Sequence, residues 1–247
     1  MRKVIIIGAS SGIGEKLALH YAQCGCMVGI AARREELLIK IAERYPHRII
    51  YQALDVTEVE NGCVINGFKK LVERIGGLDL IVYCSGAGEQ NTMLDITKEL
   101  NTVRVNVEGF ITITTAALGY FLRRGNVNGE VPQIVAISSI AAIRGLGIAS
   151  SYSASKRFQV TYMEGLSQLA VKEGTKITFT TILPGFIKTD FIKGKNYPLT
   201  MSVDYAIACI VSAIEHRFRY KIIDWKWSIV VFFWKLIPGS LWRRMKL

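Results

Sequence analysis

The chain has 247 residues, of which half are apolar and 21% are charged, with 22 glycines and five prolines. This length fits one large domain, and so large an apolar fraction excludes an intrinsically disordered or collagen-like protein. The five cysteines are scattered, and only Cys24 and Cys26 lie close together. No second pair of Cys or His residues lies at zinc-ligand spacing. We therefore expect no disulfide framework and no metal site, but buried free thiols in a reducing, cytoplasmic compartment.

Neither end of the chain predicts insertion into a membrane. The N-terminal apolar run, Val4 to Ile7, is shorter than the roughly 7–15 apolar residues of a signal peptide. The longest unbroken apolar run near the C-terminus, Ile229 to Trp234, is shorter than the about 20 residues of a spanning helix. We therefore expect neither a signal peptide nor a transmembrane segment.

Short β-branched runs alternate with longer helical patterns along the chain. The runs predict strands at Lys3–Ile7, Met27–Ala31, Arg48–Ala53, Leu78–Tyr83, Gln133–Ser138 and Lys176–Ile182. The patterns predict helices near 12–24, 34–44, 57–75, 98–124, 150–174 and 202–218. The strands are almost continuously apolar, as is typical of strands covered on both faces. The alternation predicts an α/β fold with a doubly wound parallel sheet, a Rossmann fold, in one domain (1–224) followed by a tail (225–247).

A glycine-rich segment joins the first predicted strand to the first predicted helix and reads Gly8-Ala-Ser-Ser-Gly12-Ile-Gly14. Glycine in such a turn lets the backbone approach a pyrophosphate, while the helix N-terminus offers free N–H groups and the positive end of its dipole. Three glycines alone are common in turns, but their place between a strand and a helix indicates a dinucleotide site. We expect this site to include Gly8, Ser10, Ser11, Gly12, Ile13 and Gly14.

The second predicted strand is followed by Arg33-Arg34 and not by an acidic residue. NAD enzymes of this architecture usually place an acid there to bind the ribose 2′-hydroxyl, whereas two guanidinium groups suit a 2′-phosphate. The alternative is that the arginines simply begin a solvated helix with Glu35 and Glu36. Because no acid stands at the strand end itself, we expect NADP(H) to be preferred over NAD(H).

Tyr152 and Lys156 lie four residues apart in a predicted helix and therefore share one face. A tyrosine that acts as an acid or base near pH 7 needs its pKa lowered from about 10, and a lysine ammonium about 4 Å away in a partly dry site suffices. Ser139, after the fifth predicted strand, could donate to or accept from a substrate oxygen. Taken singly, however, such a Tyr/Lys pair lies more often on a surface than in an active site.

Together these motifs resemble short-chain dehydrogenases/reductases of the short single-domain kind, over about residues 3–220. The matching segments are GASSGIG at 8–14, Asp55-Val56, Asn106-Val-Glu-Gly109, ISS at 137–139, YSASK at 152–156 and Pro184-Gly185. The interval of 13 residues from Ser139 to Tyr152 matches as well. The resemblance implies an NADP(H)-dependent enzyme that transfers hydride between the nicotinamide and a small-molecule carbonyl or secondary alcohol. It also implies a homodimer or homotetramer, paired through the fourth and fifth helices of the family.

The resemblance assigns roles to single residues. Tyr152 is implied to be the general acid in reduction and the general base in oxidation, while Lys156 lowers its pKa and holds the nicotinamide ribose. Ser139 is implied to bind the substrate oxygen and Asn106 to anchor a water of the proton relay. The alternative for Asn106 is a polar helix residue that is satisfied locally. Tyr152 and Lys156 are also implied to contact the cofactor, and the further contacts implied by the family are Asp55, Val56, Gly86, Pro184, Gly185, Ile187 and Thr189.

The chain departs from the family pattern after its fourth predicted strand. Where the family shows Asn-Asn-Ala-Gly, this chain has Tyr83-Cys84-Ser85-Gly86. Gly86 is retained, so we expect the backbone to remain accessible to the cofactor. The missing asparagines put the local hydrogen bonding in question, and not the catalysis.

The basic charge is concentrated near the C-terminus. Of the formal net charge of +11, residues 217–247 hold eight Lys/Arg against one acid, together with all four tryptophans. We expect a strand at Arg219–Ile223 and a short helix from Trp225 that is ended by Pro238-Gly239.

Tryptophans flanked by Lys and Arg are typical of segments at a lipid–water interface. Such a helix could instead cover the substrate pocket or pack against a second subunit. We expect peripheral contact with an anionic membrane, a lipophilic substrate and no nucleic-acid partner. The alternative function is a non-catalytic, NADP-binding scaffold or sensor at a membrane.

Overall fold

The computed structural model describes residues 1–125, 131–192 and 197–245, and a parallel sheet of seven strands forms its centre. The strands lie side by side in the order β3-β2-β1-β4-β5-β6-β7, and each neighbouring pair is parallel. They are β1 (Lys3–Ile7), β2 (Met27–Ala32), β3 (Ile49–Ala53), β4 (Leu80–Tyr83), β5 (Gln133–Ile137), β6 (Thr178–Pro184) and β7 (Tyr220–Ile223). The predicted doubly wound parallel sheet is confirmed.

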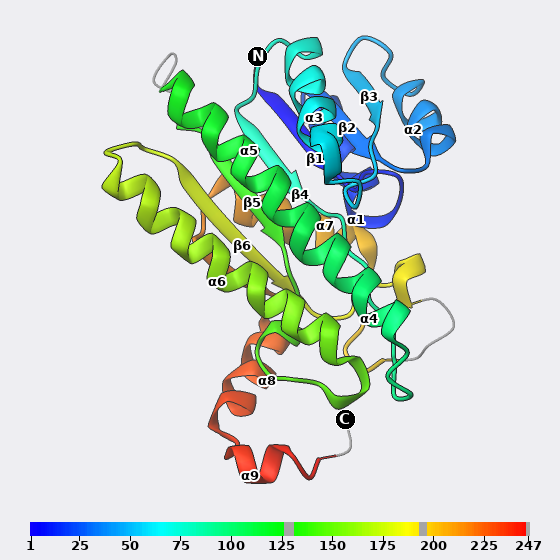
Figure 1. The fold of residues 1–247 in the computed structure, drawn as a ribbon, viewed down its shortest axis with the longest axis vertical. Coiled ribbons are helices and arrows are strands. Elements are labelled where there is room, and N and C mark those ends of the chain that lie inside the picture. Colours follow the sequence, from blue (N-terminus) through cyan, green and yellow to red (C-terminus); the bar gives the residue numbers. More distant parts are fainter. Residues whose placement is uncertain (126–130, 193–196, 246–247) are drawn as a thin grey trace.

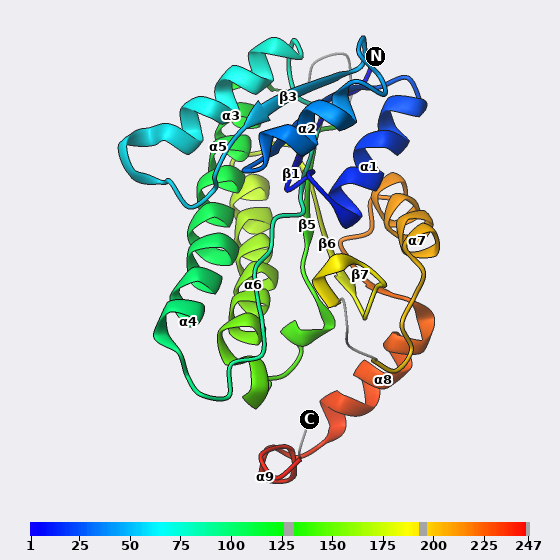
Figure 2. The same cartoon turned by 90° about the vertical axis from the view of Figure 1, so that its right-hand side faces the viewer.

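Helices cover both faces of this sheet (Figures 1 and 2). One layer holds α1 (Gly12–Gln23), α2 (Glu35–Ala42) and α7 (Val203–Glu215), and the other holds α3 (Cys63–Arg74), α4 (Ile96–Val103), α5 (Gly109–Arg124) and α6 (Ser150–Lys172). Successive residues of a strand face opposite layers, so Ile6 belongs to one buried cluster and Ile5 and Ile7 to the other. Burial on both faces explains the continuous apolar runs in the strand sequences.

Two predicted helices differ from the observed ones in an instructive way. The helix predicted at 57–75 begins only at Cys63, because Asn61 and Gly62 just before it take left-handed backbone angles. The helix predicted at 98–124 begins at Ile96 and contains a π-helical turn, η2 (Arg104–Glu108), between α4 and α5. Such turns widen the helix by one residue and often occur at functional sites.

The run Ile96–Arg124 is, within the described part of the chain, the one helix long and apolar enough to cross a membrane by length and composition alone. Half of its apolar window is buried inside the molecule. Phe110, Ile113 and Ala117 are fully buried in the cluster between the sheet and this helical layer. The helix therefore packs as a core helix of the domain.

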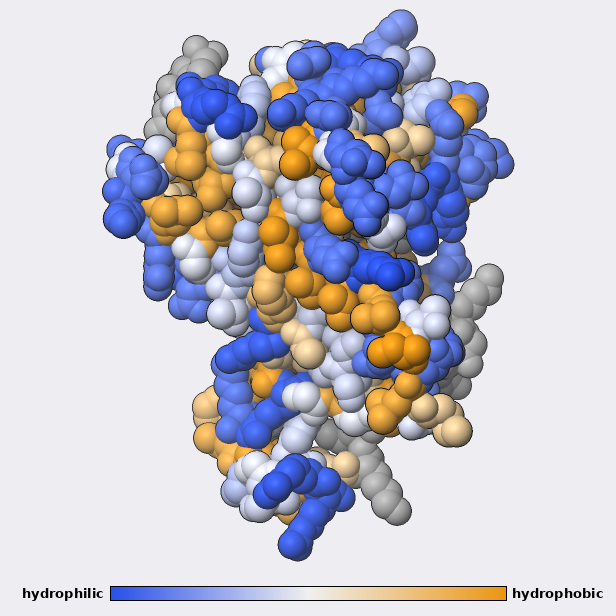
Figure 3. Space-filling model, viewed as in Figure 1, coloured by the Kyte–Doolittle hydropathy of each residue, from blue (hydrophilic) through white to orange (hydrophobic). Residues whose placement is uncertain are grey.

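The tail forms two helices, α8 (Trp225–Leu236) and α9 (Gly239–Trp242), separated at Ile237 and Pro238, which are not helical. On one side of α8, Trp227 and Val231 are buried and belong to the core cluster of the α1/α7 layer. The other side exposes Trp225, Ile229, Phe232, Phe233 and Leu236. Figure 3 shows hydrophobic surface on this lower part of the molecule, bordered by hydrophilic side chains.

The strand order reverses between β1 and β4, which are neighbours in the sheet although β2 and β3 lie between them in the sequence. In open parallel sheets, ligands bind beyond the carboxyl ends of the strands at such a switch point. The segments that follow β1, β2, β4, β5 and β6 leave the sheet at this edge. The topology therefore brings the glycine-rich turn, Ser139 and the segment after Pro184 together.

Candidate active site

A cleft with a volume of about 490 Å³ lies at this edge of the sheet. Ser139, Tyr152 and Lys156 all line it, whereas Asn106 is fully buried behind its wall. The residues expected to bind a cofactor line it as well: Gly8, Ser10, Ser11, Gly12, Ile13, Gly14, Arg33, Arg34, Asp55, Val56, Gly86, Pro184, Gly185, Ile187 and Thr189. Residues far apart in the sequence thus meet around one cavity.

The glycine-rich turn is pressed against the ends of two neighbouring strands. Gly8 has a φ of +86°, and a Cβ there would lie 2.4 Å from the backbone nitrogen of Ser85, so only glycine fits. Its N–H donates to the carbonyl of Ala31 over 2.7 Å. Ser11 is the N-cap residue of α1, but its side chain makes no hydrogen bond to the helix backbone. The N-terminus of α1 therefore faces the cleft as a site for an anion.

The side chains of the two arginines after β2 lie at the end of the cleft next to the glycine-rich turn, and they contact different residues there. Arg34 Nη2 donates to Ser10 Oγ over 2.9 Å and to Ser11 Oγ over 3.0 Å. Arg33 Nε lies 3.8 Å from the carboxylate of Asp55, and both side chains are partly exposed. Arg34 also caps α2, as the solvated-helix alternative required, but its side chain turns back to the glycine-rich turn. Two guanidinium groups and one carboxylate leave a net positive charge at this end.

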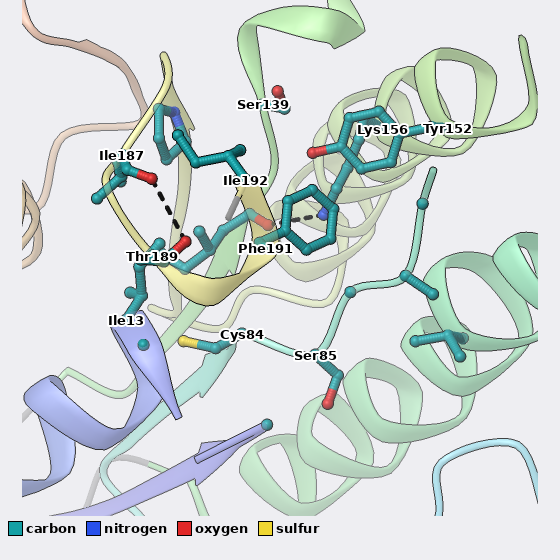
Figure 4. A pocket seen from close by; sticks show the side chains of 18 of the residues that line it. Ile13, Cys84, Ser85, Ser139, Tyr152, Lys156, Ile187, Thr189, Phe191 and Ile192 are labelled. Atoms are coloured by element: carbon teal, nitrogen blue, oxygen red, sulfur yellow. Dashed lines mark hydrogen bonds between the residues drawn. The ribbon is translucent and has the colours of Figure 1, made fainter. Parts of the chain in front are cut away.

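Tyr152 and Lys156 stand on successive turns at the start of α6 and face the same cavity as Ser139 (Figure 4). The Lys156 ammonium lies 5.8 Å from the centroid of the Tyr152 ring. Its side chain is buried, and Nζ donates to the carbonyl of Ile137 over 3.1 Å and to Gln159 Oε1 over 3.2 Å. A buried ammonium needs such acceptors, because it has lost its water.

Burial dominates the protonation of both groups. It raises the pKa of the Tyr152 phenol above its ordinary value, and a hydrogen bond with Ser139 offsets part of that rise. It lowers the pKa of Lys156 to about 8, while the nearby Cys84 acts in the opposite direction. Burial thus sets the pKa of Tyr152 in this structure, and the role of Lys156 in lowering it stays a prediction. Burial raises this pKa because a phenolate loses its water in the cleft.

Asn106 fastens the segment that follows β4. It lies in the π-helical turn, and its Oδ1 accepts from Ala87 N over 2.8 Å. Its Nδ2 donates to Ala87 O over 2.7 Å and to Ser155 Oγ over 2.9 Å. Its own carbonyl accepts from Gln159 Nε2 over 3.0 Å. The Asn106 side chain is thus satisfied by Ala87 and Ser155 from other segments, and not locally within its own helix as the alternative held. Its role in the proton relay stays a prediction.

Hydrogen bonds hold the end of β4 although the chain lacks the asparagines that the family carries there. The buried hydroxyl of Tyr83 donates to Val105 O over 2.7 Å, and Cys84 N donates to Ile7 O over 2.8 Å. Burial raises the pKa of the Cys84 thiol to about 12, so this side chain is neutral beside Lys156. The local hydrogen bonding that the sequence put in question is therefore supplied by Tyr83 and Asn106.

Sequence reasoning missed two residues that shape the site. Gln159 links Lys156 to Asn106, and its position three residues after Lys156 on one helix was the signal for that contact. Gly88 lies against the Tyr152 ring, where a Cβ would stand 2.2 Å from ring carbon Cδ2. No local pattern marks Gly88, because the ring comes from another element.

Apolar and aromatic side chains enclose the cleft around Tyr152. Phe191 lies across from Tyr152, with 5.9 Å between the ring centroids (Figure 4). Phe186 and Tyr197 stack with their centroids 4.0 Å apart. The cleft-lining apolar residues of this end are Leu146, Ile148, Phe186, Phe191, Ile192, Tyr197 and Trp234. Within the segment from Phe186 to Tyr197, which supplies four of these side chains, residues 193–196 lie outside the described residues.

Comparison with known proteins places the chain in a family. The family described as short chain dehydrogenase matches residues 2–198. The chain therefore belongs to the short-chain dehydrogenase/reductase family, whose members are oxidoreductases that use nicotinamide cofactors and act on small molecules. The predicted resemblance is confirmed at this level.

Two relatives show how far the likeness extends. An oxidoreductase of Myxococcus xanthus is 29% identical, with 97% of this chain and 94% of the relative covered. The 11-beta-hydroxysteroid dehydrogenase A of Sesamum indicum is 32% identical, with 94% of this chain and 71% of the relative covered. Both alignments extend beyond residue 198 toward the tail.

Solved structures agree on the fold. A short chain dehydrogenase from Burkholderia cenocepacia in complex with NADP superposes with a TM-score of 0.82 at 19% identity, over 100% of both chains. The 3-ketoacyl-(acyl-carrier-protein) reductase from Brucella melitensis complexed with NADH gives 0.76 at 18% identity, over 90% of this chain and 96% of the other. Because the two hold different cofactors, the likeness does not choose between NADP and NAD.

Proposed function

We propose that the protein is an NADP(H)-dependent oxidoreductase that interconverts a lipophilic carbonyl compound and its secondary alcohol. One observation carries the proposal: Ser139, Tyr152 and Lys156 share a cleft with the glycine-rich turn and with Arg33 and Arg34. A nicotinamide cofactor bound there supplies or accepts the hydride. A non-catalytic scaffold or sensor does not need Ser139, Tyr152 and Lys156 together in one cleft, so we favour an enzyme.

The chain itself moves the proton. Tyr152, which is neutral near pH 7 and whose pKa burial raises further, donates its proton to the substrate oxygen in reduction and recovers it in oxidation. Ser139 holds that oxygen with a hydrogen bond. Lys156 holds the nicotinamide ribose and offsets the charge of the Tyr152 phenolate. Asn106 keeps the loop at Gly86 in place and anchors the relay water.

The opposite end of the cleft selects the cofactor. Arg33 and Arg34 bind the 2′-phosphate, which two guanidinium groups hold with charge-assisted hydrogen bonds. The glycine-rich turn and the N-terminus of α1 bind the pyrophosphate. Asp55 and Val56 flank the adenine, and Gly86 lets the backbone approach the cofactor. The residues assigned to the nicotinamide carboxamide are Pro184, Gly185, Ile187 and Thr189.

We further propose that residues 1–224 act as the oxidoreductase unit of a cytoplasmic homodimer or homotetramer, and that residues 225–247 contact a membrane surface. Support comes from the outer side of α8, where five large apolar side chains are exposed. Asp224, the one acid after Arg217, is buried, so the exposed charge of this region is basic. Pairing two such basic surfaces repels, whereas an anionic bilayer complements them.

The substitution Tyr152→Phe tests the catalytic proposal, because it keeps the ring against Gly88 and Phe191 and removes only the proton donor. We expect kcat/KM for NADPH-dependent reduction of a panel of apolar ketones to fall about 100-fold or more, with NADPH affinity unchanged. The matched control is Tyr162→Phe in the same helix, whose hydroxyl bonds Thr115 away from the cleft. Equal rates for wild type and Tyr152→Phe would overturn the proposal.

A further inference from the structure

One arginine ties the tail to the loop between two of the residues assigned to catalysis. Arg144 lies between Ser139 and Tyr152 in the sequence and is half-buried. Its Nη2 donates to Trp234 O over 3.1 Å, to Lys235 O over 3.4 Å and to Ile237 O. These carbonyls lie at the C-terminal end of α8, where a positive charge is favoured by the helix dipole.

Trp242 of α9 completes the connection. The Arg144 guanidinium lies 5.3 Å from the centroid of the Trp242 ring, within cation–π range. Trp242 Nε1 donates to Gly145 O over 2.9 Å, and the Trp242 ring meets the Trp234 ring edge-on at 5.6 Å. We call Arg144, Trp234 and Trp242 the clasp.

The tail is also held from the opposite side of the cleft. Trp227 Nε1 donates to Leu199 O over 3.3 Å, and the Trp227 ring meets Phe186 edge-on at 5.5 Å. A Cβ on Gly185 would lie 2.0 Å from Trp227 Nε1, so glycine is needed for this close approach. The Trp227 and Trp234 rings then meet edge-on at 6.2 Å. The tail thus contacts both the loop of Arg144 and the segment that follows β6.

We infer that the clasp fixes α8 as a wall of the substrate pocket, so that Trp234 provides an apolar contact by which the cleft favours long-chain substrates. Trp234 lines the cleft, and so do Leu146 and Ile148 from the loop that carries Arg144. Arg144 acts through these side chains and is a positioning residue. The inference rests on the proposed oxidoreductase function, and it makes the tail part of that enzyme's specificity.

The test uses 2-alkanones of increasing chain length as substrates. With a fixed wall, each methylene that reaches apolar side chains raises kcat/KM about fourfold, until the pocket is full. Arg144→Ala releases the wall, so we expect 2-decanone to lose about tenfold or more in kcat/KM, through KM, while 2-butanone keeps its wild-type value. Arg144→Lys should keep part of the kcat/KM for 2-decanone that Arg144→Ala loses, because a lysine cannot both bond the three carbonyls and stack on Trp242. The matched control is Arg157→Ala, on the exposed side of α6.

Trp234→Ala provides the second variant. It should give the same dependence of kcat/KM on chain length. The double variant should lose no more kcat/KM than the more impaired of the two single variants, because the two residues act as a unit. Equal losses for short and long ketones would mean a merely structural role and overturn the inference, as would no loss at any length.

A binding measurement separates this inference from the proposed function. The affinities of 1-butanol and 1-decanol are measured by tryptophan fluorescence in the presence of NADP⁺, without turnover. Wild type should bind 1-decanol more tightly, and Arg144→Ala should lose that preference. If wild type reduces no ketone but binds 1-decanol more tightly, the proposed function is wrong and the inference about the clasp is supported. If wild type binds the two alcohols equally, the inference about the clasp is wrong.

Discussion

At the scale of single residues, burial pulls the two ionisable groups of the site in opposite directions. Tyr152 keeps its proton more firmly than an exposed tyrosine, whereas Lys156 gives up its proton more easily than an exposed lysine. Both shifts follow from the cost of a charge in a dry cavity. The charge of Lys156 survives near pH 7 because Ile137 O and Gln159 Oε1 accept hydrogen bonds from it.

We expect kcat/KM for carbonyl reduction to fall as the pH rises through about 8, the lowered pKa of Lys156. Above that pH the amine is neutral and no longer offsets the phenolate that Tyr152 becomes when it donates its proton. Gln159→Glu places a carboxylate beside the ammonium, raises its pKa and should move the fall to higher pH. Rates from pH 6 to 10 measure both profiles; an unchanged break in Gln159→Glu contradicts the assignment.

At the scale of elements, α8 has two apolar sides with different surroundings. Trp227 and Val231 are buried in the core of the domain, and Trp234 lines the cleft. On the far side, Phe232 and Phe233 are each 59% exposed, which is rare for such large rings on a monomer. The inner side therefore explains the packing of the tail, and only the outer side needs a partner.

We expect Ile229→Ser/Phe232→Ser to reduce partition onto phosphatidylserine-containing vesicles by about tenfold or more, because less apolar surface enters the interface. The matched control is Leu169→Ser/Val171→Ser, which removes two exposed apolar side chains from α6. Vesicle cosedimentation measures the partition, and high salt should weaken it for wild type. Unchanged partition in the α8 variant contradicts the membrane contact; a changed sedimentation coefficient without vesicles points to a second copy of the chain.

At the scale of the whole molecule, a bound cofactor would join segments that follow different strands of the sheet. The turn after β1, Arg34 after β2 and the loop at Gly86 after β4 all line one cleft. A ligand that binds only the folded chain stabilises the fold as a whole, by an amount set by its affinity. Thermal unfolding therefore reports on cofactor choice without a substrate.

We expect NADPH to raise the Tm more than the same concentration of NADH, because we propose that Arg33 and Arg34 bind the 2′-phosphate. Arg34→Ala should remove most of this difference and leave the Tm without cofactor close to that of wild type, since its side chain is exposed. Arg44→Ala, an exposed arginine just beyond α2, is the matched control. Equal shifts by the two cofactors in wild type contradict the preference for NADP(H).

The sequence by itself determined the strands, most helix positions, the glycine-rich turn and the pairing of Tyr152 with Lys156. These features depend on neighbours one to four residues apart, which repeat with the period of a strand or a helix. It also placed the residues proposed to bind the cofactor at one edge, because the carboxyl ends of parallel strands coincide.

Only the tertiary structure decided which side of α8 is buried, what Asn106 holds and which carbonyls Arg144 reaches. Each of these contacts joins residues far apart in the sequence, as with Arg144 and Trp234, and no periodicity encodes them. The same holds for the pKa of Tyr152, since burial by segments from elsewhere in the chain raises it. Desolvation depends on everything that surrounds a side chain, and the fold alone assembles those surroundings.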